Sequence, residues 1–504
     1  MSELEYELEK LSALENNTQA IKTVVSAVAG TLGPKGLDCM IVNDEGDFIV
    51  TNDGVTILSE MEATHPAAIM MVQAAYAQET DIGDGTTTMT VMAGQLLESA
   101  LHHAHRGVPI HKIIEGIKLG VEQAINIIQT MRFEITEQNF DFLKDIALIA
   151  GRGEVSIGEA VFHAANLLKA EKLRKKNFKF PNVIEAHEGT ENRVIHGVIV
   201  DRKPLSHDYG YAIHRAKLLI LDDAMEQEQL CEESLSTENG FQQYIENRKQ
   251  MQGWVEKILE LKVNAIFCCR GIDEQVQQLF TDASVFVVDH TPREQLKKLA
   301  LHTGGKAIKR SVLNKTVEEL EYYCGNAAEI FYDDKLEYIG VLEGSGEEMV
   351  TVLISASTGS VTKEMERVAT DAAAALQAAV KGGIVPGGGV TELACAIKLQ
   401  EMNSRNDSLA KYGVECVVEC LKKPIYHIVK NAGFQPLEKI EKLSEQIRVT
   451  KNNGLGINCD TGEIENMLDR RIVDPALVKV SAIKTASEIA QAILKINTIL
   501  KGRL

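Results

Sequence analysis

Residues 83–88, with the sequence GDGTTT, are the strongest candidate for chemistry in this chain, and they precede a helical pattern that carries Met92, Leu96 and Leu101. A helix start built from small residues offers free backbone N–H groups and a positive dipole end to an anion, and threonine hydroxyls add donors. Phosphate could bind there. Asp84 fits such a site if it holds Mg²⁺, because Mg²⁺ takes one or two carboxylates and lets phosphates supply other ligands. A capped helix after a tight turn is the alternative.

Three further turns could approach a ligand. Residues 31–36 (TLGPKG) end a helical pattern, residues 52–54 form an acidic Asn-Asp-Gly turn, and residues 385–389 (VPGGG) place three glycines before a helix. The first two are ordinary turns when taken alone. Consecutive glycines suggest close approach to a bound group, although an interdomain hinge would explain them as well. None of these loops matches G-x-x-x-x-G-K-[ST] or a strand-borne G-x-G-x-x-G, so neither a P-loop nor a Rossmann site is indicated.

The composition bounds the class of protein. A chain of 504 residues exceeds the usual size of one hydrophobic core, so two or three domains are expected. Hydrophobic residues make up 45% and charged residues 25%, which is typical of globular proteins. The net charge of -19 argues against a nucleic-acid partner, because phosphate binding relies on clustered Lys and Arg.

The location follows from what the sequence lacks. The opening MSELEYELEK has no secretory pattern, and no apolar run approaches the roughly 18 residues of a membrane span. The nine scattered cysteines form no C-x-x-C pair and fit a reducing cytosol better than disulfides or a zinc site. We therefore expect a cytoplasmic protein that binds neither nucleic acid nor membrane.

The elements that must position these turns follow from hydrophobic spacing. Apolar residues three and four apart predict helices over residues 17–32, 66–78 and 88–105, with helical patterning as far as 128, while 39–42 and 48–51 read as a β-hairpin. Short apolar runs at 218–221, 265–269 and 285–288 alternate with helical segments such as 273–280, which predicts an α/β middle with a mainly parallel core. Residues 222–257 read as a helical excursion, and helices resume at 362–380. The fold class is therefore multidomain α/β with helical ends.

Five short motifs along the chain resemble those of a known protein family. TLGPKG, TNDGVTIL (51–58), GDGTTT, VPGGG and VDPALVK (473–479) resemble the chaperonin family in their order and spacing over nearly the whole chain. The excursion at about 222–257 stands where archaeal-type (group II) chaperonins carry a built-in lid. The chain also ends in ILKGRL rather than the Gly-Gly-Met repeats of many bacterial-type members. The lidded type is therefore favoured, and the divergent group III branch is a further candidate.

The resemblance implies a division into three domains. Residues 1–130 and 381–504 would form a helical equatorial ATP-binding domain. Residues 131–194 and 347–380 would form an α/β intermediate hinge domain, and residues 195–346 an α/β apical, substrate-binding domain with a helical protrusion.

The resemblance also assigns roles within one nucleotide site for ATP and Mg²⁺, with K⁺ as a further candidate ion. Asp84 would hold the metal, and Asp371 and Asp53 would position the attacking water. The phosphates would be wrapped by Thr31, Leu32, Gly33, Pro34, Gly85, Thr86, Thr87 and Thr88. The rest of the nucleotide would meet Gly387, Gly388, Asn458, Cys459 and Asp474, the last on the ribose. Because Asp371 would belong to the intermediate domain, it would reach the γ-phosphate only when the subunit closes.

The implied function is ATP-driven folding of non-native polypeptides inside stacked rings, with eight subunits in each ring. A bacterial-type chaperonin with a separate co-chaperonin, a small-molecule ATP-dependent kinase or ligase, and a non-hydrolysing assembly remain as alternatives. One departure concerns residues 147–153, which replace a Thr- and Ser-rich stretch ending in Gly-Lys. In the family this lysine senses the γ-phosphate, and Arg152 is the candidate to replace it.

Overall fold

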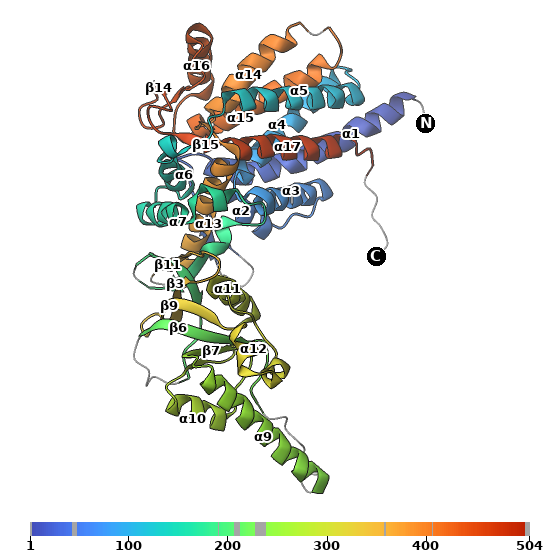
Figure 1. The fold of residues 1–504 in the computed structure, drawn as a ribbon. Coiled ribbons are helices and arrows are strands. Elements are labelled where there is room, and N and C mark those ends of the chain that lie inside the picture. The colour runs from blue at the N-terminus through green and yellow to red at the C-terminus, as the bar shows by residue number, and fades with distance from the viewer. Residues whose placement is uncertain are drawn as a thin grey trace. The chain divides into compact units, whose positions relative to one another are not determined.

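The computed structural model describes residues 3–42, 48–189, 191–205, 212–226, 238–356, 359–405 and 407–498. The chain divides into two compact units (Figure 1). The first comprises Met1–Phe162, Lys172–Asn182 and Arg367–Leu504, and the second comprises His163–Glu171 and Val183–Glu366. Both ends of the chain therefore build one unit and its middle builds the other. The finer division into three domains remains a prediction.

The first unit is mainly helical, and the predicted loops lie at the ends of its helices. Its helices are α1 (Glu3–Val28), α2 (Gly54–Glu60), α3 (Pro66–Ile82), α4 (Thr86–His105), α5 (Ile110–Met131), α6 (Phe142–Ala150), α14 (Val390–Asn403), α15 (Lys411–Asn431), α16 (Pro436–Thr450) and α17 (Ala476–Leu494). Two helices belong partly to this unit and partly to the second, α7 (Val155–Arg174) and α13 (Gly359–Gly382). Its short strands are β1 (Cys39–Val42), β2 (Phe48–Thr51), β12 (Ile384–Pro386), β13 (Leu455–Ile457), β14 (Ile464–Asn466) and β15 (Val473–Pro475).

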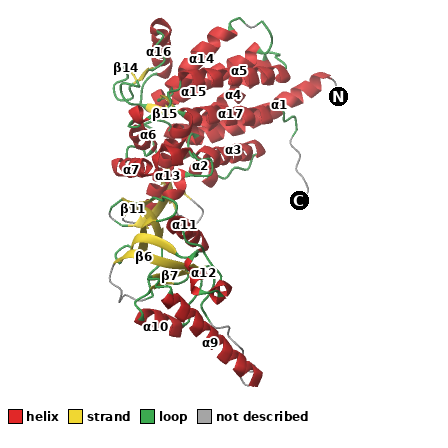
Figure 2. Cartoon of the chain, viewed as in Figure 1, coloured by secondary structure: helices red, strands yellow, loops and turns green. Residues whose placement is uncertain are grey.

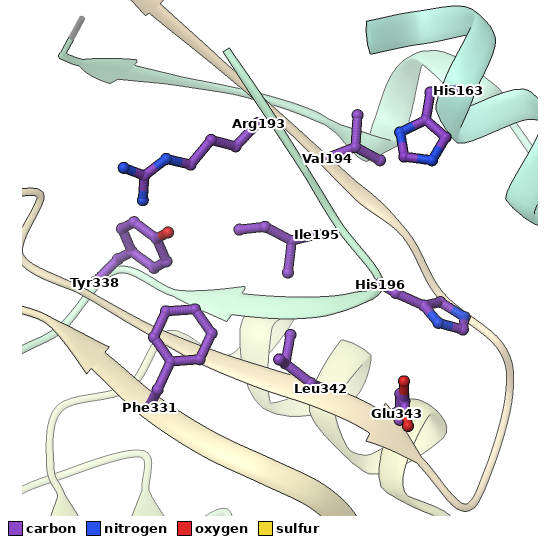
Figure 3. Close-up of a pocket in the computed structure, with 9 residues that line it drawn as sticks. All are labelled: His163, Arg193, Val194, Ile195, His196, Phe331, Tyr338, Leu342 and Glu343. Atoms are coloured by element: carbon purple, nitrogen blue, oxygen red, sulfur yellow. The ribbon is translucent and has the colours of Figure 1, made fainter. Parts of the chain in front are cut away.

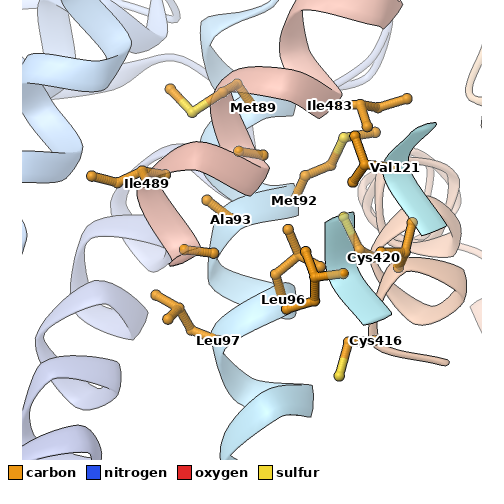
Figure 4. Close-up of a cluster of buried hydrophobic side chains, with 14 of the residues drawn as sticks. Met89, Met92, Ala93, Leu96, Leu97, Val121, Cys416, Cys420, Ile483 and Ile489 are labelled. Carbon is orange, nitrogen blue, oxygen red and sulfur yellow. The ribbon is translucent and has the colours of Figure 1, made fainter. Parts of the chain in front are cut away.

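Helix α4 forms the centre of this unit, where it packs against α1, α15 and α17. Figure 4 shows side chains of α4, α5, α15 and α17 filling one core, among them Met92, Leu96, Val121, Cys416, Cys420 and Ile483. Burying an aliphatic side chain of this size contributes roughly 1.5–3 kcal/mol. The beginning of α4 is therefore held rigidly, and with it the loop that precedes it.

The second unit contains the longer strands, drawn yellow in Figure 2. Its elements are β3 (Ile184–Glu188), β4 (Arg193–Ile195), β5 (Gly197–Val200), β6 (Ala212–Leu221), α9 (Glu238–Glu260), β7 (Ala265–Cys268), α10 (Glu274–Asp282), β8 (Phe286–Val288), α11 (Arg293–Thr303), α12 (Val317–Glu321), β9 (Gly325–Asp333), β10 (Tyr338–Gly344) and β11 (Thr351–Ala356). A six-stranded sheet has the order β5-β10-β9-β6-β7-β8, and a three-stranded sheet has the order β3-β11-β4.

Successive residues of β6 point to opposite faces of the six-stranded sheet, as strand geometry requires. Leu219 and Leu221 join a core with α9 and α10, whereas Leu218 and Ile220 join another core with α11. Both faces of this strand are therefore covered by helices, which explains why its end reads as a continuous apolar run.

The structure confirms several sequence predictions and corrects one. The hairpin of 39–42 and 48–51 is present with those bounds, and α4 begins two residues earlier than expected. The expectation of a mainly parallel core is only partly right. Strands β6, β7 and β8 run parallel, but β5, β10, β9 and β6 pair antiparallel. Residues 334–337 join β9 to β10 directly, and a short connection of this kind allows only an antiparallel pair.

Helix α9 confirms part of the expected excursion. From Met251 onward it contributes to the core, whereas none of the described side chains at 242 and 244–250 is buried. The expectation that apolar residues of the excursion such as Leu230 and Leu235 contact non-native clients falls on residues 227–237, which lie outside the described residues. No helix in the described part of the chain has the length and apolar character needed to span a bilayer.

Candidate functional site

The loop between α3 and α4 has a conformation that favours glycine on both sides of Asp84. Gly83 ends α3 with a φ of 76°, and Gly85 caps α4 with a φ of 83°. The N–H of Gly85 donates to Asp84 Oδ1 (2.6 Å). The predicted acidic turn is therefore present, and the free N–H groups of the first turn of α4 follow it directly.

The acidic turn at Asp53 lies against this helix start. Asp53 is buried and caps α2, where its Oδ2 accepts from the N–H (3.0 Å) and the hydroxyl (2.6 Å) of Thr56. A Cβ atom added to Gly54 would lie 2.4 Å from Thr87 Oγ1 and 3.0 Å from Thr86 Oγ1. Only glycine allows this approach, which brings two of the predicted motifs together.

Helix α13 brings Asp371 to the same place. A Cβ added to Gly83 would lie 2.5 Å from Cβ of Ala374, which is three residues beyond Asp371 on this helix. Arg152, whose backbone has a left-handed φ of 55°, holds its Nη2 3.8 Å from Asp371 Oδ2. In this structure Asp371 belongs to the same compact unit as the phosphate loops.

One turn earlier on α13, Arg367 reaches the cap of α2. Its Nη1 donates to Thr56 Oγ1 (2.7 Å) and to Thr51 Oγ1 (3.3 Å), and lies 4.0 Å from Asp53 Oδ2. Helix α13 thus supplies both a cation and a carboxylate to this cluster.

The carboxyl groups repel one another. Burial, together with the neighbouring Asp474 and Asp53, raises the pKa of Asp84 to about 6, although the Gly85 N–H and Lys479 act in the opposite direction. A buried carboxyl next to other acidic groups favours its neutral form. A cation bound here would reverse that preference.

Two more carboxyl groups share this environment. Burial, with Asp53 and Asp84 nearby, raises the pKa of Glu79 to about 7. Burial, with Glu79, Asp53 and Asp84, raises the pKa of Asp371 well above its usual range, while Arg152 opposes the effect. The four groups on α3, α13 and the two loops therefore form one interacting cluster, which we call the carboxyl cluster.

Asp474 also lies near the α3–α4 loop, since its charge contributes to the raised pKa of Asp84. It pairs with Val385 across the β12–β15 ladder, and a Cβ on Gly387 would lie 3.1 Å from Asp474 Oδ1. Lys479 Nζ bridges Asp474 Oδ2 (2.7 Å) and the fully buried Glu392 Oε1 (2.8 Å). Burial alone would lower the pKa of Lys479, but Asp474 and Glu392 outweigh it and raise that pKa.

Residues 31–34 form the turn after α1. The Thr31 hydroxyl donates to Val28 O (2.9 Å), and the Leu32 carbonyl accepts from Asn431 Nδ2 (2.9 Å). Gly33 has a φ of 90°, and Pro34 follows it in the turn. A hollow of about 290 Å³ beside this turn is lined by Ala27, Gly30, Thr31, Lys35, Leu37, Asp38, Cys39 and Asn431.

An ion pair joins this turn to the loop at Asn458 and Cys459, which is predicted to meet the nucleotide. Lys35 Nζ lies 2.7 Å from Asp460 Oδ1. Asn458 organises the loop because its Oδ1 accepts from Asp460 N (2.8 Å), and Cys459 lies between these two residues. Nearby, Met467 Sδ would contact Cβ atoms added at Gly388 (3.9 Å) and Gly456 (2.9 Å). Among the described residues, no hydrogen bond or ion pair joins the 31–36 turn directly to the carboxyl cluster.

The donor set fits Mg²⁺ carried by a nucleotide better than a metal held by protein alone. Within the described ranges, no three His, Cys, Asp or Glu side chains are arranged to hold a metal ion. Mg²⁺ commonly takes one or two carboxylates and completes its shell with water and phosphate. Asp84 is buried beside Asp53 and Asp474, and a bound Mg²⁺ would relieve the repulsion between these carboxyl groups.

A second hollow, of about 430 Å³, lies in the second unit, and Figure 3 shows its lining. Its base is apolar, with Ile195, Phe331 and Leu342. Two of its polar groups already have partners, since Arg193 pairs with Asp333 (3.0 Å) and His196 lies 3.5 Å from Glu348. None of the residues predicted to bind nucleotide lines it.

Sequence reasoning missed four charged residues of the site. Lys479 was within the quoted VDPALVK motif, and Arg367 precedes Asp371 by four residues, a spacing that brings side chains to one helix face. Either could have been noticed. Glu79 and Glu392 carry no local signal, because only the fold brings them near their partners.

Comparisons with known proteins agree with this arrangement. The model of the TCP-1/cpn60 chaperonin family matches residues 24–503. The thermosome subunit of Pyrococcus abyssi is 32% identical over 97% of this chain and 90% of its own length. That of Desulfurococcus sp. strain SY is 32% identical over 96% and 91%. The chain therefore belongs to the TCP-1/cpn60 chaperonin family.

A solved structure makes the comparison sharper. The crystal structure of a group III chaperonin in the open state aligns with a TM-score of 0.91 and 38% identity, covering 98% of this chain and 99% of that one. The chain thus has the chaperonin fold and is a chaperonin subunit of the archaeal-type or group III kind. The predicted family and the predicted fold class are therefore confirmed.

Proposed function

We propose that this subunit hydrolyses Mg²⁺-ATP and uses the reaction to fold non-native polypeptides inside a closed chamber. The observation that carries the proposal is the carboxyl cluster: Asp371 stands beside Asp53 and Asp84 at the amino end of α4, with Arg152 3.8 Å from Asp371. A small-molecule kinase or ligase is disfavoured by the family match over residues 24–503.

The residues of the chain divide the work of phosphoryl transfer. Free N–H groups at the start of α4, with the hydroxyls of Thr86, Thr87 and Thr88, would bind phosphate oxygens. Asp53 and Asp371 would orient the attacking water and accept its proton. Such reactions need little covalent help, so positioning and charge stabilisation supply most of the catalysis. Asp84 is the residue that would hold Mg²⁺, which neutralises phosphate charge when bound.

Residues 31–34, together with the loop at Asn458 and Cys459, would bind the rest of the nucleotide. The Lys35–Asp460 ion pair supports this, since it connects the two loops. Asp474 would meet the ribose while Lys479 holds its carboxylate. Gly387 allows Asp474 to approach, and the space beside Gly388, where a Cβ would meet only Met467 Sδ at 3.9 Å, would receive the nucleotide. K⁺ is a further candidate ion.

The β1–β2 hairpin supports assembly into rings. Met40, Val42 and Phe48 are more than half exposed, at 63%, 61% and 66%, and within the described part of the chain the two strands pair only with each other. A lone two-stranded hairpin is marginal in water, and an open apolar edge is a pairing site. We propose that a neighbouring subunit covers it, in stacked rings of eight in the cytoplasm.

Residues 222–257 would close the chamber as a built-in lid. The amino-terminal part of α9 supports this, because its described side chains extend beyond the core of the second unit. A separate co-chaperonin would then be unnecessary. The bacterial-type alternative, which needs one, is disfavoured by the thermosome relatives.

The test combines two measurements on the purified chain. Phosphate release from ATP should require Mg²⁺, and native mass measurement should find a large oligomer whose size is independent of modest dilution. A chain that stays monomeric and inert toward nucleotide would overturn the proposal. A ring that binds ATP without hydrolysing it would favour the non-hydrolysing assembly.

A further inference from the structure

Gln78 is a fully buried amide at the junction of three elements. It lies on α3 with only 1% of its surface exposed. Its Nε2 donates to the backbone carbonyl of Asp84 (2.9 Å), and its Oε1 accepts from Ser481 Oγ (2.9 Å) and Thr485 Oγ1 (3.3 Å) of α17. One side chain therefore links α3, the Asp84 loop and α17.

The Asp84 peptide needs an external partner. Because Gly83 and Gly85 both have left-handed backbones, the carbonyl between them lies outside the hydrogen-bond ladders of α3 and α4. The Gln78 amide donates to this carbonyl and so fixes the plane of the Asp84 peptide. A carbonyl that is shielded from water and loses its donor destabilises the loop, which would then adopt another conformation to restore a hydrogen bond.

The same amide sets the position of α17. Helix α17 begins just after Asp474 and carries Lys479, which pairs with it. Ser481 lies two residues beyond Lys479, on the helix that Gln78 holds. Gln78 thus joins the proposed metal ligand to the helix that secures the proposed ribose ligand.

We propose that Gln78 is a positioning residue for the Mg²⁺-nucleotide site, which keeps Asp84 and Asp474 at a fixed separation. The inference rests on the proposed function. In this proposal Gln78 acts through its bonds to the Asp84 backbone and to α17 and does not itself bind the metal or the nucleotide. Outer partners of this kind typically change metal affinity about 10–100-fold when removed.

Gln377 provides a matched control in the same unit. It is 6% exposed on α13, and it also makes three hydrogen bonds through a buried amide. Its Oε1 accepts from Phe180 N (3.0 Å), and its Nε2 donates to the carbonyls of Leu173 (2.9 Å) and Phe178 (2.8 Å). It secures the 172–182 segment and has no contact with the Asp84 loop among those bonds.

The experiment compares Gln78→Met with Gln377→Met, two near-isosteric changes. Both should lower the melting temperature by similar amounts. At saturating ATP, Gln78→Met should raise the Mg²⁺ concentration for half-maximal turnover by about 10-fold, the lower end for an outer partner. Gln377→Met should leave it within about twofold. Ser481→Ala, which removes one bond to Gln78, should shift it in the same direction by less.

Equal Mg²⁺ requirements for the two Gln variants would overturn the inference, because a purely structural role affects both alike. If Gln78→Met does not fold, Ser481→Ala becomes the test of the inference. An unchanged Mg²⁺ requirement in that variant would overturn the inference. A wild-type chain that neither binds nor hydrolyses Mg²⁺-ATP would instead overturn the proposed function. Hydrogen exchange at 83–85 distinguishes the cases, since Gln78→Met should accelerate it with or without nucleotide.

Discussion

Gly83 and Ala374 touch so closely that a Cβ atom on Gly83 would lie 2.5 Å from the Cβ of Ala374. Through this contact, the loop that carries Asp84 rests on the helix that carries Asp371. No side chain fits between them. The spacing of the two carboxylates therefore depends on one glycine.

Gly83→Ala should impair both stability and turnover. Its φ of 76° is strained for alanine, at a cost of about 1–3 kcal/mol, and the new methyl group meets Ala374. Chemical denaturation and phosphate release measure the two effects. Adding Ala374→Gly should restore part of the turnover by removing the clash, although the strain remains. A double variant no better than Gly83→Ala would argue against the contact.

Asp371→Ala and Asp84→Ala should separate turnover from binding. Asp371→Ala should keep ATP affinity within about threefold and lower turnover about 100-fold or more, as loss of a proton acceptor does. Asp84→Ala should weaken Mg²⁺-nucleotide binding by about 10-fold or more, equivalent to about 1.4 kcal/mol. Calorimetric binding and steady-state phosphate release measure both effects. Normal turnover in either variant contradicts its assigned role.

Arg152→Ala should slow hydrolysis more than Arg152→Lys does. The guanidinium lies 3.8 Å from Asp371, where it favours the charged form of that carboxyl. Lysine keeps the positive charge, whereas alanine lets the pKa of Asp371 rise further. The pH dependence of turnover should therefore move to higher pH in Arg152→Ala. Identical profiles for the two variants would exclude Arg152 as the counterpart of the sensing lysine.

Glu79→Gln should stabilise the nucleotide-free protein above neutral pH. The folded state holds the Glu79 proton up to a pKa of about 7, against about 4.5 when unfolded, so stability is lost as pH rises between these values. Glutamine removes that loss, which amounts to at most about 3 kcal/mol at pH 8 and vanishes near pH 4. Denaturation at both pH values measures it, with Glu122→Gln as control, because the Glu122 side chain is exposed. A gain that is equal at both pH values would contradict the assignment.

Deleting residues 229–248 should leave ATP hydrolysis intact and abolish encapsulation. The segment includes the amino-terminal part of α9, which contributes no described buried side chain before Met251. Protease protection of a trapped, unfolded client measures closure. A deletion variant that still protects its client would show that another element closes the chamber.

Local patterns predicted the elements well where a signal is local. The β1–β2 hairpin has its predicted bounds, and the glycines around Asp84 form the expected turn before α4. Strand pairing was harder to predict. The apolar runs of β6, β7 and β8 indicated parallel strands but gave no sign of the antiparallel strands beside them. The order and spacing of the five motifs indicated the family, whereas hydrophobic periodicity by itself could not have done so.

The site was predictable only in part for a similar reason. Asp84 and Asp53 stand in recognisable turns, whereas Glu79 lies at the end of α3 in an ordinary acidic run. Its proximity to Asp371 arises from helix packing between segments almost three hundred residues apart. Side-chain spacing within a single helix cannot predict contacts between residues so far apart in the sequence.

The cysteines inside the helical core allow unfolding of the first unit to be measured by thiol alkylation. Burial, with Glu392 near one thiol and Glu415 near the other, raises the pKa of Cys395 and Cys416 to about 12, and burial also raises that of Cys420. Because only a thiolate is alkylated readily, a reagent at neutral pH modifies these positions when the core comes apart. Because alkylation is irreversible, the fraction of these cysteines that is labelled over hours would report how often the first unit has unfolded, and it would increase with exposure to heat.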